Sequence, residues 1–500
     1  MNERPSTSRA TEPLHSSRHC FAQPRFADES AVLADAYRLL DDAVIRYQGH
    51  PVGTMASLDP RAPAENYRDC FVRDFVSAAF LMLLEGRSDV VREFLAMILR
   101  MRGQQEELEG QQIAPGVLPA SFRVITLDDG SEQLSADFGD RAIGRVAPVD
   151  SMMWWAVLLR AYVRYTGDTA FAHTPEVQRG LRMILSLCLQ SRFEVFPTLL
   201  VPDGSFMVDR RMGVNGHPLE IQALFDMTLR AADLLTVDEG SHWLMDLAKR
   251  RRGVLRDYVR RYYWLDINVL NEVHRFSTEK FGHDVDNVFN IYPESIPEWV
   301  ADWLPDDGGY FVGNLGPGRI DFRFFSQGNF LATMAGLATA EQGDLLMRTV
   351  TERWDDLVGQ MPVKLVYPPV RGAEWRLMTG SDPKNVPWSY HNGGNWPVLI
   401  WPMVAAALAA DRQDLGERAF RVAERRLMVD NWPEYYDGRH GRLIGRRANL
   451  HQVWSATGLL LARHLLANPS CLVDLALTED EDSVPGNGRG GSAQSDRGDD

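Results

Sequence analysis

The sequence predicts an all-α protein, an (α/α)6 barrel in which a ring of buried helices lies inside a ring of amphipathic helices. Two kinds of helical pattern alternate along the chain, one apolar on nearly all sides and the other with a single charged face. Short turns lead from most buried helices to the next amphipathic one, and long segments lead back. The 500 residues, 45% of them hydrophobic, suffice for one large core. Strands are expected to be minor and confined to loops.

The buried kind of helix occurs six times. A helix without a polar face has to be covered by protein on most sides, so these segments are expected to form the inner ring. They span residues 71–85, 151–166, 218–234, 327–340, 396–410 and 450–466.

The amphipathic kind also occurs six times and alternates with the first. One face of each helix is charged and is expected to meet water, while the other packs on the inner ring. These helices span residues 31–47, 89–101, 175–190, 240–263, 344–357 and 415–430.

Six long segments return the chain from each amphipathic helix to the next buried one. In a barrel of antiparallel helices all six should emerge at the end where the inner helices begin. Long ordered loops in a compact domain are usually functional, so this end is the candidate active face. The segments are 48–70, 102–150, 191–217, 264–326, 358–395 and 431–449.

The ends of the chain differ in composition from its middle. Residues 1–28 and 471–500 are predicted to be disordered because they are polar and have little to bury, which leaves 29–470 as the barrel domain. The four cysteines form no metal or disulfide pattern and are expected to be free thiols in a reducing compartment. With neither an apolar leader nor a membrane-length apolar run, a cytoplasmic location is predicted. The net charge of −15 argues against nucleic acid and acidic membranes as partners.

Asp209 is the first candidate for acid–base chemistry. It lies in the third long segment and is followed by Arg210, with His217 and Glu220 downstream. Perturbed carboxyl groups are typical of active sites, but a carboxyl group beside arginines is as readily a plain salt bridge.

Glu434 is the second candidate. It lies in the sixth long segment between Trp432 and Tyr435, and aromatic neighbours desolvate a carboxyl group, raise its pKa and suit it to proton transfer. The plainer alternatives are a helix cap or an ion pair with Arg439. Two carboxyl groups on one face of a barrel are what cleavage of a glycosidic bond requires.

Other polar groups are expected to bind the sugar. Arg73 and Asp74 interrupt an apolar stretch and need a ligand or each other as partner. Asp150 is expected to N-cap its helix and also to be able to bind a hydroxyl. Alternating rings and polar groups in the fifth segment favour a carbohydrate site over a metal site, although His391 could be structural. The candidate sugar-binding residues are Arg73, Asp74, Asp150, Trp154, Arg210, His217, Arg323, Asp382, His391, Trp396 and Tyr435.

Together these segments resemble the neutral/alkaline invertases, glycoside hydrolase family 100. The resemblance runs through about residues 30–468 and is carried by VRDF (72–75), VAPVDS with WW (146–155), FPTLLV with DGSFMVDRRMG (196–213), GHPLEIQALF (216–225), FNIYPESIPEW (289–299), DFRFF (321–325), EWRLMTGSDPKN with PWSYHNGG and WP (374–397) and WPEYYD with GRLIG (432–445).

The resemblance implies a six-hairpin (α/α)6 glycosidase that hydrolyses sucrose to glucose and fructose with inversion and without a metal or other cofactor. It implies Asp209 as general acid and Glu434 as general base, and Arg73 with Asp74 as the residues that hold the glucosyl ring. The resemblance also leads us to expect that the protein forms a homo-oligomer. For this chemistry Asp209 must keep a proton, so its neighbouring arginines should point elsewhere, or the charge of Glu434 must offset them. A separation of about 6.5–9.5 Å between the two carboxyl groups would leave room for water.

Three rival functions remain at this level. A different α-glucosidase could use the same barrel, and a non-catalytic sugar-binding barrel would keep the aromatic residues but tolerate loss of either acid. An (α/α)6 terpene cyclase or prenyltransferase would need acidic clusters for Mg²⁺–diphosphate or a zinc site. The densest acidic run, EDEDS at 479–483, lies instead in the predicted tail.

Overall fold

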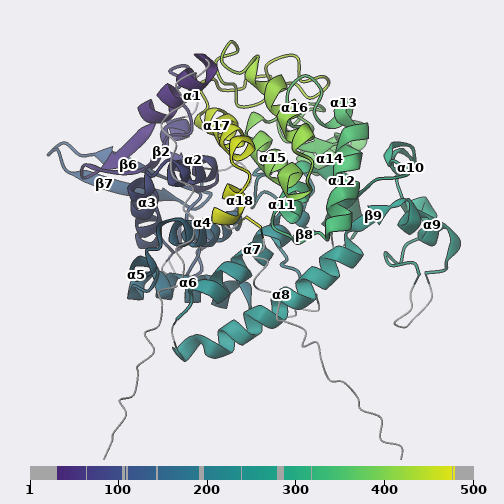
Figure 1. The fold of residues 1–500 in the computed structure, drawn as a ribbon, viewed down its shortest axis with the longest axis horizontal. Coiled ribbons are helices and arrows are strands. Elements are labelled where there is room, and N and C mark those ends of the chain that lie inside the picture. The colour runs from purple at the N-terminus through teal and green to yellow at the C-terminus, as the bar shows by residue number, and fades with distance from the viewer. Residues whose placement is uncertain are drawn as a thin grey trace, which may run out of the picture.

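The computed structural model shows a mainly helical molecule (Figure 1). It describes residues 31–62, 65–103, 107–108, 111–141, 145–190, 196–237, 239–278, 286–316, 318–475 and 477–478. The tail predicted at residues 1–28 lies outside these ranges, as do Cys20 and residues 479–500 of the tail predicted at 471–500. Within the described part, no helix is long and apolar enough to cross a membrane.

Six helices touch one another in a closed order, each packing on the one before it and the one after it. Their side chains are buried along most of their length because they carry almost no polar face. The helices are, in order of contact, α2 (Val72–Leu84), α4 (Asp150–Thr166), α7 (Leu219–Leu235), α11 (Ser326–Met334), α15 (Ile400–Ala409) and α17 (Val453–Ala467), and α17 returns to α2.

Six further helices pack on the outside of this ring, each burying one face. They are α1 (Ala31–Asp42), α3 (Ser88–Arg100), α6 (Pro175–Cys188), α8 (His242–Tyr262), α12 (Ala340–Glu352) and α16 (Gln413–Glu424). The shorter helices are α5 (Thr169–Ala172), α9 (Ile267–Arg275), α10 (Glu298–Trp303), α13 (Trp354–Leu357), α14 (Gly372–Thr379) and α18 (Cys471–Asp474), with 3₁₀ turns η1 (Glu65–Arg68), η2 (Glu239–Ser241), η3 (Pro293–Ser295) and η4 (Pro397–Leu399).

Strands lie between the helices, as expected, and most belong to three small antiparallel sheets. In Figure 1 the hairpin of β6 and β7 projects on one side of the molecule, and α9 and α10 project on the other. The sheets are β1 (Val44–Tyr47) with β2 (His50–Thr54); β3 (Cys70–Phe71), β6 (Ser121–Thr126) and β7 (Glu132–Asp137); and β8 (His217–Pro218), β9 (Trp264–Asp266), β10 (Gly309–Leu315), β11 (Ile320–Phe325) and β12 (Val366–Tyr367). A further short pair joins β4 (Glu107–Leu108) to β5 (Gln111–Gln112).

The largest of these sheets joins the third, fourth and fifth long segments. Strand β10 pairs with β8, β9 and β11, and β11 pairs with β12. Side chains reinforce the join, since Asn314 donates to the Asn215 carbonyl at 2.9 Å and Arg323 to the Met212 carbonyl at 3.3 Å. The fourth segment therefore braces the loop that carries Asp209.

Several predicted helix bounds are wrong for identifiable reasons. The first amphipathic helix ends at Asp42, because Gln48 and Gly49 adopt positive φ (50° and 82°) and turn the following residues into the β1–β2 hairpin. The helix α12 begins at Ala340, earlier than expected, because Thr339 and Gln342 form a capping box.

The folded part extends past residue 470. The short helix α18 packs on α4, and Cys471, Leu472, Leu475 and Leu477 are buried, so the chain still has apolar side chains to cover there. The free-thiol prediction is confirmed for the three described cysteines, Cys70, Cys188 and Cys471, which are buried and form no disulfide.

Candidate active site

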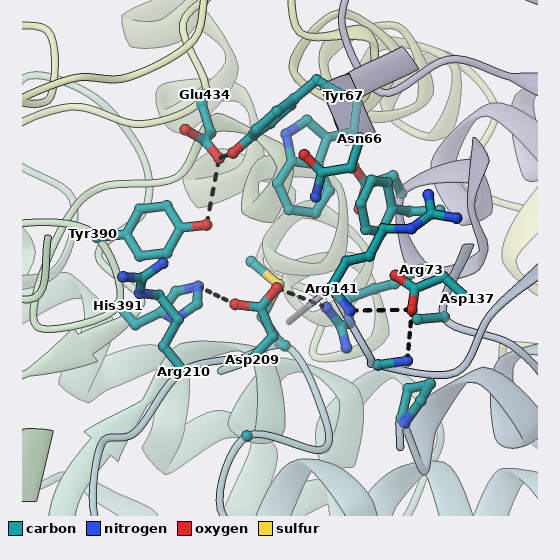
Figure 2. Close-up of a pocket in the computed structure, with 18 of the residues that line it drawn as sticks. Asn66, Tyr67, Arg73, Asp137, Arg141, Asp209, Arg210, Tyr390, His391 and Glu434 are labelled. Carbon is teal, nitrogen blue, oxygen red and sulfur yellow. Dashed lines mark hydrogen bonds and ion pairs between the residues drawn. The ribbon is translucent and has the colours of Figure 1, made fainter. Parts of the chain in front are cut away.

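A pocket of about 300 Å³ opens where the inner helices begin (Figure 2). Five of the six long segments contribute to its lining, while the fourth contributes none among the residues that the structure describes. The first turns of α2, α4 and α17 complete the wall with Arg73, Asp74, Ser151 and Trp454. The predicted active face is thus hollowed at the expected end of the helices.

Asp209 lies on one side of this pocket and makes only loose contacts there. Its side chain is 40% accessible, and that surface faces the pocket. Arg73 Nη1 lies 3.8 Å from one carboxylate oxygen, and His391 Nε2 lies 3.7 Å from the other. Burial raises the pKa of Asp209, and the nearby cations Arg73, Lys384 and Arg210 oppose that rise.

The loop of Asp209 is held from both ends. Asp203 accepts hydrogen bonds from the backbone of Met212 at 2.9 Å and of Gly213 at 2.8 Å, which closes the loop on itself. Arg210 turns away from Asp209 and forms a bidentate pair with Asp382, at 2.7 and 2.9 Å. The arginine next in sequence is therefore neutralised by another carboxylate.

Glu434 faces Asp209 from the other side of the pocket (Figure 2) and is only 2% exposed. Tyr67 donates a hydrogen bond of 2.8 Å to Oε1, and Tyr390 one of 3.4 Å to the same atom. Lys384 Nζ lies 3.7 Å from Oε2, which also accepts from the Asn449 backbone at 3.5 Å. Donors on both oxygens are the setting that stabilises an ionised carboxylate.

The fifth and sixth segments approach each other closely beneath Glu434. A Cβ at Gly438 would lie 1.5 Å from the Gly393 carbonyl oxygen, so only glycine allows this contact. The buried Lys364 amine donates to the Gly438 carbonyl and, at 3.0 Å, to Asn395 Oδ1. These backbone contacts fix the loop that bears the glutamate.

His391 lies behind Asp209 as a buried ring, 2% exposed, between Tyr390 and Trp396. Burial and the nearby cations hold its pKa well below the usual range for histidine. The ring is therefore neutral next to the acid, and its Nε2 meets Asp209 without adding another full positive charge.

Comparison with known proteins assigns the family. The family model described as alkaline and neutral invertase, a glycoside hydrolase family, matches residues 36–469. The chain belongs to this family. It is a glycoside hydrolase.

Relatives in plants are similar over nearly the whole chain. Neutral/alkaline invertase 1, mitochondrial, of Oryza sativa subsp. japonica is 47% identical over 471 residues, which is 92% of this chain and 75% of the relative. Cytosolic invertase 1 of the same organism is 46% identical over 95% of this chain and 84% of its own length. Relatives named mitochondrial, chloroplastic and cytosolic all match, so membership of the family does not set the compartment.

Solved structures of other glycosidases share the fold. A bacterial glucoamylase in complex with acarbose gives a TM-score of 0.53 at 9% identity, covering 90% of this chain and 56% of that one. The mannosylglycerate hydrolase of Thermus thermophilus, a family 63 enzyme, gives 0.51 at 14% identity over 87% and 100%. At these identities the structural similarity supports the helical glycosidase fold and says nothing about substrate or mechanism.

The structure places part of the sugar-binding set expected for this invertase-family chain in the pocket. Seven of the predicted site residues line it: Arg73, Asp74, Asp209, Arg210, His391, Trp396 and Glu434. Two more act from behind these. Asp382 holds Arg210, and Tyr435 stacks on Trp396 at 5.5 Å and donates to the Arg446 carbonyl at 2.6 Å.

Three predicted site residues lie elsewhere. Trp154 is 1% exposed and packs edge-on against Trp401 inside the ring, because its helix turns that side chain toward a neighbouring helix. His217 is in β8 and meets the ring of Phe196. Arg323 is in β11 and pairs with Asp321, with its guanidinium turned to the Met212 carbonyl. His217 and Arg323 therefore belong to the sheet behind the site and do not line the pocket.

The N-cap predicted for Asp150 is wrong. Val149 occupies the cap position of α4 without a side-chain bond, and Asp150 is the first residue of the helix. Its carboxylate is fully buried and accepts a hydrogen bond from Arg73. Arg73 and Asp74 do not form the mutual ion pair considered above; Arg73 hydrogen-bonds Asp150 and lies 3.8 Å from Asp209.

Sequence reasoning missed several lining residues, chief among them Tyr67, Tyr390 and Trp454. Tyr67 had no local signal, because it lies in the short 3₁₀ turn η1 and is 367 residues from Glu434. Tyr390 lies in the fifth segment, where Lys384 and other polar groups alternate with rings, and that alternation could have identified it.

Proposed function

We propose that this chain hydrolyses sucrose with inversion at the glucosyl carbon, with Asp209 as general acid and Glu434 as general base. The observation that carries the proposal is the contrast between the two facing carboxyl groups. Asp209 has a raised pKa and basic side chains no nearer than 3.7 and 3.8 Å, whereas donors contact both oxygens of Glu434. Membership of the invertase family supports the substrate.

In this mechanism Asp209 gives its proton to the glycosidic oxygen as the bond to the glucosyl carbon breaks. Glu434 removes a proton from a water molecule that attacks that carbon from the opposite face. The products are β-glucose and fructose, and the proton balance is restored by solvent. The carboxyl separation of about 6.5–9.5 Å belongs to this proposal, because an attacking water has to fit beside the sugar.

The remaining pocket residues are assigned by their chemistry. Arg73 and Asp74 line the pocket and would hold hydroxyls of the glucosyl ring. Burial raises the pKa of Asp74 to about 8, and the nearby Asp209 and Glu434 add to that rise, so its carboxyl group can donate as well as accept a hydrogen bond. Trp396 and Trp454 supply ring surface beside the sugar.

The proposal extends to fold and location. The closed order of six inner helices and the likeness to other glycosidases support an (α/α)6 barrel of the six-hairpin type. Three buried free thiols fit a reducing compartment such as the cytoplasm, which is the location we propose. Self-association stays a prediction.

The test is a single incubation followed by NMR. Purified protein is mixed with sucrose and, separately, with a panel of other α-glucosides, and the anomer of freshly released glucose is recorded before mutarotation. We expect sucrose to be cleaved fastest and β-glucose to appear first. Release of α-glucose first would establish retention, and faster cleavage of another glucoside would replace sucrose as substrate.

A further inference from the structure

Arg73 lies between two carboxylates. Its Nε donates to Asp150, and its Nη1 lies 3.8 Å from Asp209 Oδ2, too far for a hydrogen bond. The Arg73 side chain is only 13% exposed, so little water screens either interaction. A cation placed at hydrogen-bond distance from Asp209 would favour its ionised form, which cannot act as an acid.

Among the described residues, the Asp150 side chain accepts its one hydrogen bond from Arg73. It is fully buried at the start of α4, and its second oxygen, Oδ1, accepts no hydrogen bond among the described residues. It does not line the pocket, so its own carboxylate is not placed to bind sugar. A buried carboxylate is costly unless it is paired, and here the partner is a residue of the pocket wall.

We propose that Asp150 is a positioning residue for the acid. By holding the Arg73 guanidinium from behind and offsetting its charge, it prevents a full Arg73–Asp209 ion pair and lets Asp209 keep the proton that the leaving oxygen takes. The inference rests on the proposed function, because it needs Asp209 to be the acid.

A third carboxyl group, that of Glu220, lies near the same arginine. Glu220, in the first turn of α7, is buried and accepts a hydrogen bond of 3.1 Å from the Met207 backbone, two residues before Asp209. Burial raises the pKa of Glu220 to about 8, and Asp150 adds to that rise. The ionisable groups around Asp209 are Arg73 and Asp74 from α2, Asp150 from α4, Glu220 from α7, Arg210 beside it, Lys384, Tyr390 and His391 from the fifth segment, and Tyr67 and Glu434 across the pocket.

The first test is Asp150→Asn, assayed on sucrose across pH. The loss of kcat/KM at high pH reports deprotonation of the acid in the free enzyme. Removing the Asp150 charge and freeing Arg73 should both lower the pKa of Asp209. We therefore expect the basic limb to move about one pH unit downward, equivalent to about a tenfold loss on the alkaline side, with the acid limb nearly unchanged.

The matched control is Asp226→Asn. Asp226 is also a fully buried aspartate, paired with Arg252 at 3.0 Å and Arg256 at 3.5 Å, but it lies on α7 outside the pocket. Its basic limb should coincide with that of the unmodified protein. An equal shift in both variants, or none in Asp150→Asn, would overturn the inference.

A second variant keeps the inference testable if Asp150→Asn does not fold. The double variant Arg73→Gln/Asp150→Asn removes both charges and leaves no unpaired buried ion at this pair. Arg73→Gln alone should move the basic limb upward, because Asp209 loses a nearby cation, even though weaker sugar binding raises KM. If Asp150 acts through Arg73, the double variant should have the same basic limb as Arg73→Gln. A basic limb of the double variant about one unit below that of Arg73→Gln would show that Asp150 acts on Asp209 without Arg73, and the inference would be overturned.

Failure of the inference can be told apart from failure of the proposed function by Asp209→Asn. Retained sucrose hydrolysis in that variant would show that Asp209 is not the acid, and the proposed function would fall. Lost hydrolysis together with an unmoved basic limb in both Asp150 variants would overturn only the role of Asp150.

Discussion

The two sides of the pocket place the same functional group, a carboxyl group, in opposite electrostatic surroundings. On one side Asp209 is 40% accessible, belongs to a loop, and meets Arg73 and His391 only at 3.8 and 3.7 Å. On the other side Glu434 is almost sealed, and Tyr67 hydrogen-bonds it at 2.8 Å. The first carboxyl group has cations near it but no short bond from them, and the second has donors on both oxygens.

Under the proposed mechanism, this difference means that solvent exposure alone does not assign the two roles, and that the donors and cations around each carboxyl group have to be considered with it. The more buried of the two, Glu434, is the one with donors to support a negative charge. The more accessible one, Asp209, has its neighbouring cations occupied elsewhere, Arg210 by Asp382 and Arg73 by Asp150. Pairs of titratable groups with divergent environments are the usual sign of an acid and a base.

The strongest test of this difference between Asp209 and Glu434 is to remove each carboxylate in turn and to compare substrates with different leaving groups. Glu434→Gln should lose about 10³-fold or more in kcat on both sucrose and α-glucosyl fluoride, because both need an activated water. Asp209→Asn should lose a similar factor on sucrose but far less on α-glucosyl fluoride, because fluoride departs without a proton. Steady-state kinetics on both substrates measures the effect.

Circular dichroism of both variants should match that of the unmodified protein, and Asp344→Asn, on the outer helix α12, should retain full activity. Equal losses for Asp209→Asn on the two substrates would remove the distinction between the two sides. A large loss on fluoride for Asp209→Asn and a small one for Glu434→Gln would exchange their roles.

A smaller effect is expected from Tyr67→Phe, which deletes the short hydrogen bond to Glu434 Oε1 and leaves the ring in place. A hydrogen bond to a charged group contributes about 1.5–3 kcal/mol, so the base loses a donor that holds it in place. We expect kcat/KM on sucrose to fall about tenfold. Tyr162→Phe is the control, since Tyr162 donates an equal bond of 2.8 Å to Asp168 outside the pocket. An unchanged kcat/KM, or an equal loss in the control, would contradict this role of Tyr67.

The periodic parts of the molecule were the predictable ones. Helices such as α4 and α7 follow from an apolar pattern that repeats every turn, and Asp209 and Glu434 follow from a motif resemblance within two long segments. The β1–β2 hairpin was missed because VIRY fits a helical stripe as well as a strand, and only the positive φ of the next two residues decides between them.

The partners of the site residues were less predictable because they depend on contacts between distant segments. Arg73 and Asp150 are 77 residues apart, and the start of a helix suggested capping for Asp150. Trp154 lies one turn into the same helix, yet its ring is directed into the core by the packing of α4 on its neighbours. The packing of the whole ring determines which side of an inner helix faces the pocket. A local sequence pattern does not contain that information.

The smallest expected effect concerns Lys384, a cation that acts on both sides of the pocket. Its amine lies 3.7 Å from Glu434 Oε2 and 3.8 Å from the centre of the Tyr390 ring, and its charge lowers the pKa of Asp209. Lys384→Met should therefore move the basic limb of the pH profile upward by about half a unit, since Asp209 loses a cation that lowers its pKa. The Lys249→Met control removes an exposed lysine of α8 that pairs with Asp233 at 3.0 Å, and it should leave the basic limb in place. An unmoved basic limb in Lys384→Met would show that this lysine does not act on Asp209, and the two sides of the pocket would then share no cation.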